Sequence, residues 1–414
     1  MNAVSRAGTI PSSCLHEVFN AAELRERATG RPVIKLHVGE PYFKPPQEVA
    51  EAAAEAVRGG RTAYTSAEGM PALREALAVK LEMENGHHTS PDHIFVTPGS
   101  CQGLAALMQS MAEPGDELLL PELHWPIHLQ QCLLAGFRPV FYPLGADYRP
   151  TAEGIRAALT PRTRAILINS PANPTGAVLD ADALAAILAV ARERDVQIIS
   201  DEAYEHFVYD GEHTSFASLE RGLPESERRI SSTFSFSKSL AMTGYRLGYV
   251  VTPNRRAADA MRVVQEASLV SPSTPVQYAG LTALKSRDSA VRNAALVRAN
   301  RDRALPALRD AGLLAELPQG GWYAVLDVAG VCDDAEEFVQ GLLERYDVGL
   351  APAAGFALRP VVSESVRTLS AEPAPEARTL VRLAFCGDPQ ELDTGVERLL
   401  AHTAQWRAAS GGHP

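Results

Sequence analysis

One lysine stands among small hydroxyl side chains in the segment Ser231-Ser-Thr-Phe-Ser-Phe-Ser-Lys238-Ser. Of the five lysines in the chain, only Lys238 has such neighbours and no carboxylate close to it in sequence. A lysine that acts as an amine nucleophile needs a depressed pKa, which partial burial and a nearby positive charge provide. Arg246, eight residues further on, could supply that charge. An imine-forming amine and a loop lysine solvated by serines explain this segment equally well.

A strand, a Gly/Ser turn and a helix are predicted in succession between residues 93 and 112. His93–Thr97 has the pattern of a short strand and Leu104–Ala112 that of a helix, with Gly99, Ser100 and Cys101 in the turn. Backbone N–H groups and the helix dipole at such a helix start both face an anion, so the turn is suited to a phosphate. A βα turn without a ligand has the same pattern.

Two polar side chains are expected where buried strands end. The apolar run 164–169 leads into Asn173 of an Asn-Pro-Thr-Gly turn, and the run 196–200 leads into Asp201. This edge is where α/β sheets place their ligands, and a carboxylate buried there is costly unless it is paired. Glu202 competes with Asp201 on sequence grounds, but its spacing directs it to the opposite face of the strand.

Four further residues suit ligand contacts but also have ordinary structural explanations. Arg382 lies within an apolar strand, where its guanidinium needs either a structural salt bridge or a bound carboxylate. Gly39 opens a Gly-Glu-Pro turn, whose free N–H groups can bind a carboxylate. Trp125 adds bulk to a core, and Tyr64 lies in a Gly-rich loop, where a tyrosine usually packs or faces solvent.

The elements that must position these residues alternate between strand and helix through the middle of the chain, as in a doubly wound α/β domain. Strands are expected at 33–38, 117–121, 137–142, 164–169 and 196–200, and helices at 11–31, 45–58, 70–85, 151–159, 180–194 and 255–268. The stretch 275–311 predicts a long helix that kinks or splits near Ser286. Beyond it, strands at 320–327 and 379–385 and helices at 335–346 and 391–403 indicate a second part of α+β character.

Composition excludes several classes of protein. A formal net charge of -11 argues against a general nucleic-acid or membrane-surface binder, which normally carries a basic excess. The five cysteines are scattered without CxxC or His/Cys ligand spacing, which predicts a reducing compartment and no structural metal. No apolar run approaches the length of a membrane span or a signal peptide. We therefore expect a cytoplasmic protein with no nucleic-acid or membrane partner.

The lysine segment resembles a known family. Ser235-Phe-Ser-Lys238, followed by Gly244-Tyr-Arg246-Leu-Gly248, is similar to the cofactor-attachment segment of class I/II aminotransferases, which are enzymes of pyridoxal-phosphate (PLP) fold type I. The resemblance covers nearly the whole chain, points to the subgroup of bacterial aspartate aminotransferases, and is weakest from 358 to 378. It implies that Lys238 is the catalytic residue and forms the internal aldimine with pyridoxal 5'-phosphate.

The resemblance also implies a set of contacts to the cofactor phosphate. One residue comes from the partner subunit, because Tyr64 matches a tyrosine that crosses to the neighbouring site, and this implies an obligate homodimer with shared active sites. The other residues lie in the same chain as the lysine: Gly99, Ser100, Cys101, Ser235 and Arg246.

Four residues are implied as partners of the pyridine ring. Trp125 matches the aromatic residue that stacks on the ring, which keeps the ring oriented. Asn173 and Tyr204 match the residues that contact the 3-hydroxyl oxygen. Asp201 matches the carboxylate that binds the protonated ring nitrogen and so makes the ring an electron sink.

The substrate contacts implied by the resemblance are Gly39, Asn173 and Arg382, with the guanidinium of Arg382 binding the α-carboxylate. Cys101 departs from the family pattern, because many aspartate-using relatives carry Thr or Lys there. A thiol is a weak donor without charge, so Cys101 does not support recognition of a substrate's distal carboxylate, and the side chain of the substrate is not readable from the sequence.

The expected fold is a large doubly wound PLP-binding domain with a mostly parallel sheet at 47–290, and a smaller α+β domain from 1–46 and 291–414. The expected reaction moves the amino group of an α-amino acid to a 2-oxo acid. A lyase, cyclase or oxidase acting on an amino acid in a biosynthetic pathway is the alternative, because the pocket decides the fate of the carbanion. A PLP-sensing regulator would need a DNA-binding domain, and too few residues precede Gly39 for one.

One segment is longer than in the shorter relatives. Residues 358–378 are rich in Pro, Ser, Glu and Arg and lie just before Arg382 in sequence. A long polar loop next to a substrate-binding residue suggests either a lid or a plain surface insertion.

Overall fold

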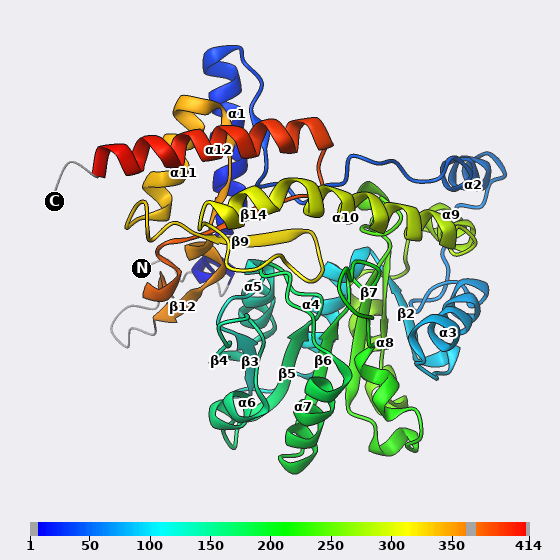
Figure 1. Cartoon of the computed structure of the whole chain (residues 1–414). Coiled ribbons are helices and arrows are strands. Elements are labelled where there is room, and N and C mark those ends of the chain that lie inside the picture. Colours follow the sequence, from blue (N-terminus) through cyan, green and yellow to red (C-terminus); the bar gives the residue numbers. More distant parts are fainter. Residues whose placement is uncertain (1–6, 362–369, 411–414) are drawn as a thin grey trace, which may run out of the picture.

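A seven-stranded sheet forms the centre of the computed structural model, which describes residues 7–361 and 370–410 (Figure 1). Its strands lie in the order β2-β8-β7-β6-β5-β3-β4. Strands β3 to β7 pair in parallel, and only β8 runs antiparallel to its neighbours, so the predicted mostly parallel sheet is confirmed. The bounds are β2 Ile94–Thr97, β3 Glu117–Pro121, β4 Arg138–Tyr142, β5 Thr163–Asn169, β6 Gln197–Asp201, β7 Ile230–Ser235 and β8 Gly248–Val251.

Helices cover both faces of this sheet because successive strand residues point to opposite sides. Leu118 and Leu120 pack with one group of helices and Leu119 packs with the other. The first group consists of α4 (Gly99–Met111), α5 (Pro126–Ala135) and α8 (Arg255–Ser268). The second consists of α6 (Ala152–Ala158) and α7 (Ala181–Glu193). Helices α2 (Gln47–Arg58), α3 (Pro71–Asn85) and α9 (Thr274–Ala283) lie on the side of β2, the edge strand (Figure 1), and share a core with β2, β7 and β8.

A second, three-stranded antiparallel sheet joins the C-terminal third of the chain. Its order is β11-β14-β9, with β9 at Tyr323–Asp327, β11 at Ala351–Pro352 and β14 at Leu380–Ala384. Helices α10 (Arg287–Asp310), α11 (Ala335–Tyr346) and α12 (Pro389–Ser410) pack around a core that contains Trp322 and Phe338. No helix of the described ranges is long and apolar enough to span a bilayer.

The N-terminal segment belongs to this second part. Strand β1 (Ile34–Lys35) pairs in parallel with β10 (Val348–Gly349), and α1 (Cys14–Thr29) lies beside α11 (Figure 1). An ion pair of 2.9 Å between Arg25 Nε and Asp347 Oδ1 ties the two segments together. The prediction that both ends of the chain build a smaller α+β unit is therefore confirmed.

Two element boundaries differ from expectation. The strand predicted at 33–38 ends after Lys35, because the Val38 N–H donates to the Lys35 carbonyl and turns the chain. Helix α4 starts at Gly99, five residues before the predicted helix, so the expected turn forms the first turn of the helix. The predicted break near Ser286 is confirmed, since α9 ends at Ala283 and α10 starts at Arg287.

The flanks of the polar segment 358–378 form an antiparallel hairpin of β12 (Leu358–Val361) and β13 (Ser370–Pro373), and residues 362–369 lie outside the described part. Leu358 packs against the core on the α4 and α5 face of the large sheet. The Arg359 guanidinium lies 5.9 Å from the ring centroid of Phe141 in β4. The described flanks therefore pack against the large sheet and are not a free loop.

Candidate active site

A cavity of about 400 Å³ opens where β5, β6 and β7 end, below β9 of the second sheet. Parallel strands bring their carboxyl ends to one edge of a sheet, so residues far apart in sequence meet there. Nine of the residues singled out from the sequence line this cavity: Ser100, Cys101, Trp125, Asn173, Asp201, Tyr204, Ser235, Lys238 and Arg246.

Lys238 lies three residues after the end of β7 and is half-buried. Its Nζ atom lies 4.9 Å from the ring centroid of Trp322 and 5.5 Å from that of Tyr204. Within residues 7–361 and 370–410 no carboxylate forms an ion pair with this amine. An amine held against aromatic faces, without a counter-ion, is available to react with a carbonyl group.

Asp201 ends β6, and only 4% of its surface is exposed. Its Oδ2 atom accepts a hydrogen bond of 2.9 Å from Nε2 of His128, and its Oδ1 atom accepts one of 3.2 Å from the Ala203 N–H. His128 lies in α5, and its ring meets that of Trp125 edge-on with centroids 5.2 Å apart. We did not assign His128 a role from the sequence. The available signal was its position three residues after Trp125, which places both side chains on one face of a helix.

The start of α4 and the guanidinium of Arg246 lie against each other. Gly99 has a φ of +78°, and a Cβ atom there would lie 2.6 Å from Nη2 of Arg246. A Cβ at Gly248 would lie 2.4 Å from the Ser100 backbone nitrogen. Because neither glycine has a side chain, the backbone N–H groups at the start of α4 and the guanidinium of Arg246 can lie together on one concave surface. Such a surface is suited to bind a phosphate.

Tyr204 and Cys101 are held in their un-ionised forms. Burial raises the pKa of Tyr204, whose hydroxyl lies 3.4 Å from that of Tyr323. Burial also raises the pKa of the Cys101 thiol, whose sulfur accepts a hydrogen bond of 3.4 Å from Gln131 Nε2. Both groups can donate a proton in hydrogen bonds to a ligand in the cavity.

Arg382 is buried in β14, and no acidic residue in the described part of the chain pairs with it. Its guanidinium lies between the rings of Tyr323 and Phe356, at 4.2 and 4.6 Å from their centroids. It donates to the His37 carbonyl at 2.6 Å and to Asn173 Oδ1 at 3.3 Å, while its buried Nε has no partner in the described residues. A buried cation that meets only neutral oxygens is suited to a carboxylate ligand, since no described residue forms the salt bridge considered above.

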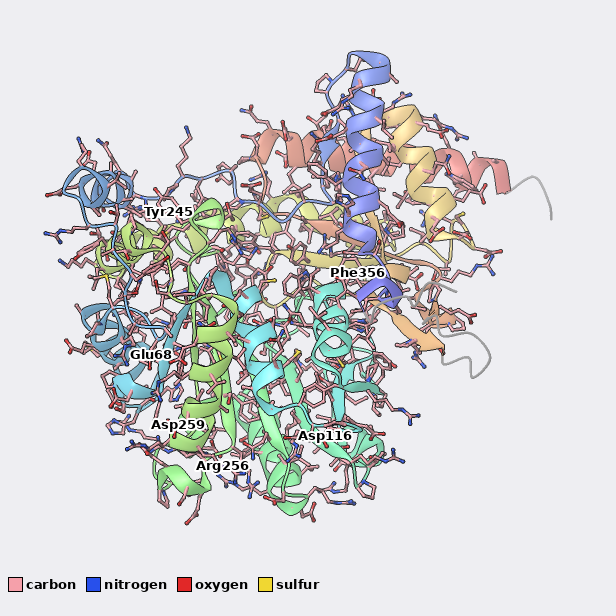
Figure 2. All side chains as sticks on the ribbon, turned by 180° about the vertical axis from the view of Figure 1, so that it is seen from behind. Glu68, Asp116, Tyr245, Arg256, Asp259 and Phe356 are labelled. Atoms are coloured by element: carbon pink, nitrogen blue, oxygen red, sulfur yellow. The ribbon has the colours of Figure 1, made fainter. Side chains whose placement is uncertain are left out.

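Figure 2 shows where Arg382 lies in the molecule, because Phe356, which contacts its guanidinium, is labelled beside α1. Asp116, which precedes β3, lies at the opposite end of the large sheet in the same view.

Four predicted residues are not among those that line this cavity: Gly39, Tyr64, Gly99 and Arg382. Gly39 lies against Tyr323, and a Cβ atom at Gly39 would fall 1.7 Å from the Tyr323 hydroxyl oxygen, so no other residue fits there. Tyr64 is 85% exposed and does not line the cavity of its own chain. Glu202 is excluded from the cavity as predicted, since it bonds to Ser200 and His213 on the other face of β6.

The residues present fit PLP in kind. Lys238 offers an amine for its aldehyde, Asp201 a carboxylate for its ring nitrogen, and Trp125 an aromatic face for its ring. The glycine-lined start of α4 and Arg246 suit its phosphate. Tyr323 and His128 complete the surroundings but were not among the predicted residues.

Comparison with known proteins gives consistent matches. The family model described as aminotransferase class I and II matches residues 31–399. The aspartate/prephenate aminotransferase of Thermus thermophilus is 36% identical over 344 residues, which is 82% of this chain and 87% of that protein. The aspartate aminotransferase of Geobacillus stearothermophilus is 34% identical over 408 residues, 95% of this chain and 96% of that protein. The solved structure of the Thermus thermophilus aspartate aminotransferase with maleate superposes with a TM-score of 0.86 at 33% identity, covering 97% of this chain and all of that one.

Proposed function

Because the chain belongs to the class I and II aminotransferases, we propose that the cavity around Lys238 is its active site. The enzyme depends on PLP and moves an amino group from an amino acid to a 2-oxo acid. The observation that supports the location is that an amine with no carboxylate partner among the described residues, a buried carboxylate and a glycine-lined helix start meet around one cavity. The matches do not favour the lyase, cyclase or oxidase alternative.

The residues around the amine have complementary roles in this proposal. Bound PLP supplies an electron sink for the charge that develops at the substrate Cα. Lys238 is the attachment amine, and it then takes the Cα proton as a general base and returns it as a general acid. Asp201 keeps a proton at the ring nitrogen, and the hydrogen bond from His128 fixes the orientation of its carboxylate. Trp125 and Tyr204 hold the ring in place.

The substrate α-carboxylate binds Arg382 in this proposal. The side chain of Asn173 already accepts from that guanidinium, and the backbone at Gly39 borders the same space. A guanidinium offers two parallel hydrogen bonds to a carboxylate, so it fixes the direction of the Cα–H bond as well as the affinity. This places the Cα between Arg382 and the amine of Lys238.

A homodimer completes the site. Tyr64 is 85% exposed in the single chain, although its loop is held by a hydrogen bond of 2.6 Å from Thr274 Oγ1 to the Ala63 carbonyl. Val57 and Val270 are also more than half exposed. An ordered loop with an exposed tyrosine is suited to contact a second subunit, where it would reach the phosphate site.

We also propose that residues 47–290 form the large domain and that residues 1–46 and 291–414 form the small one. The boundary after residue 290 falls in the first turn of α10. A cytoplasmic location is supported by the free thiols of Cys101, Cys132, Cys332 and Cys386.

The reaction is tested with pure holoenzyme, single amino acids and 2-oxoglutarate, following the new 2-oxo acid, glutamate and ammonia separately. Transamination gives glutamate and the new 2-oxo acid in equal amounts without ammonia. Ammonia released at the rate of 2-oxo acid formation would instead identify elimination or oxidation.

The shared site is tested by mixing two inactive variants, Tyr64→Ala and Lys238→Ala. Each hybrid dimer has one site with both wild-type residues if Tyr64 crosses between subunits, so activity should return toward half of the wild-type value per hybrid. If Tyr64 acts within its own chain, hybrids stay as inactive as the parents.

A further inference from the structure

A second cavity of about 440 Å³ adjoins the first and contains Arg382. Trp125, Ile127 and Tyr323 line both cavities and form their common border. A substrate whose carboxylate binds Arg382 and whose Cα lies near Lys238 therefore has this second cavity beside it. This step rests on the proposed active site, and the cavity is large enough for a bulky side chain.

The walls of the second cavity are mainly apolar. Leu15 and Phe19 of α1 form one side, and Trp125 and Ile127 at the start of α5 form another. Phe19 remains 40% exposed, so a large apolar side chain lies at the rim with part of its surface uncovered. Covering this exposed apolar surface with an apolar ligand removes it from water and so favours binding.

Positive charge is scarce in the second cavity. Among the described residues that line it, Arg382 is the only arginine or lysine, and the α-carboxylate occupies it. His37 is buried, and burial lowers its pKa to about 4, so its ring is neutral near pH 7. The start of α1 also faces this space, but the N–H groups of Leu15 and His16 already donate to Ser13.

We propose that the second cavity receives the side chain of the substrate, and that the enzyme prefers amino acids with bulky uncharged apolar side chains over aspartate and glutamate. The second carboxylate of aspartate would meet mainly apolar walls and, among the described lining residues, no second arginine or lysine. A charge removed from water without a partner is unfavourable. An apolar side chain would instead cover Leu15, Phe19 and Ile127. The preference thus differs from the substrate named for the aspartate aminotransferases that the chain resembles.

The test measures binding of unreactive carboxylates to the wild-type holoenzyme by calorimetry. 3-Phenylpropanoate and 4-methylpentanoate represent apolar substrates, and maleate and succinate represent dicarboxylates. We expect the apolar compounds to bind at least tenfold more tightly. If maleate binds as tightly as the apolar compounds, or more tightly, the proposal is overturned. This outcome would also follow if the partner subunit supplied a cation to the second cavity.

The same holoenzyme is then mixed with phenylalanine, leucine or aspartate without an acceptor, and the change in cofactor absorbance is followed. Conversion by aspartate in preference to the others refutes the side-chain proposal but leaves the aminotransferase assignment intact. Conversion by no amino acid at all would instead refute the proposed active site.

Two arginine substitutions in α5 give a matched pair. Ile127→Arg places a guanidinium in the second cavity and should raise maleate affinity at least tenfold while lowering that of 3-phenylpropanoate. Leu134→Arg adds the same charge to the same helix at a residue that is 47% exposed and outside both cavities, and should leave both affinities unchanged. Equal responses of the two variants contradict the assignment of the cavity. His16 also lines the second cavity, so His16→Gln tests whether its ring acts as a counter-ion: a loss of maleate affinity in this variant contradicts the proposal.

Discussion

The close approach of Gly99 and Arg246 allows a sharp test of the proposed phosphate site. Replacing Gly99 by Ala adds a Cβ atom 2.6 Å from Nη2 of Arg246, so the guanidinium must move. The backbone there has a φ of +78°, which costs an alanine about 1–2 kcal/mol in the folded protein. Two separate losses are therefore expected, one of stability and one of cofactor affinity.

Gly115→Ala separates these losses. Gly115 has a φ of +93° but no atom within 4 Å of an added Cβ, so this variant carries the backbone strain alone. The thermal unfolding temperature of the apoenzyme should fall by similar amounts in both variants. Displacing Arg246 removes a charge-assisted hydrogen bond, worth about 1.5–3 kcal/mol, so Gly99→Ala should also raise the Kd of PLP roughly 10- to 150-fold.

The assay is a titration of apoenzyme with PLP and with pyridoxal, followed by tryptophan fluorescence, since Trp125 lines the cavity. Pyridoxal lacks the phosphate, so its Kd should be the same in Gly99→Ala and Gly115→Ala. The reasoning is refuted if Gly99→Ala weakens both ligands equally, or if it leaves PLP binding at the level of Gly115→Ala.

Three other predictions concern buried or reactive groups. Lys238→Ala should abolish the cofactor adduct that borohydride reduction fixes to the chain, and a surviving adduct would point to another amine. Asp201→Asn should retain much of the PLP binding but lose turnover, because the ring nitrogen is no longer held protonated; near-normal turnover would contradict this role. Only 10% of the Glu205 side chain is exposed, and this desolvation opposes its ionisation, but Lys80 at 2.6 Å and His206 lower its pKa to about 2 from the usual 4.5. The ionised Glu205 therefore stabilises the fold above pH 4.5, and this stabilisation is lost as the pH falls toward 2. Between these pH values the unfolding free energy of the wild type should fall by about 2–3 kcal/mol more than that of Glu205→Gln. If the unfolding free energies of the two proteins fall in parallel with pH, this role of Glu205 is excluded.

The sequence predicted the positions that depend on local pattern. Asn173 and Asp201 follow buried strands, and Gly99 lies between a strand and a helix, so the carboxyl edge of a parallel sheet brings them together. His128 and Tyr323 were missed because their roles depend on contacts with residues far along the chain. The His128–Asp201 bond spans 73 positions, and no periodicity within one helix reports such a partner.

The hairpin at 358–373 was missed for a related reason. Its polar and proline-rich composition is typical of a loop, yet Leu358 packs against the large sheet and Arg359 covers Phe141. Pairing between two short strands depends on the surface that receives them, which composition does not describe.

The pairing of β1 with β10 has a consequence for synthesis of the chain. Ile34 and Val348 are more than 300 residues apart, whereas the seven strands of the large sheet are complete by Val251. At about 5–20 residues per second, the N-terminal segment waits roughly 15–60 s for its partner strand to be translated. A nascent chain that stops short of Val348 therefore contains every strand of the large sheet and Lys238, but it lacks β14, the strand that carries Arg382. During that interval α1 has neither α11 nor β11 to pack against, because the residues of β11 and the end of α11 are still to be made.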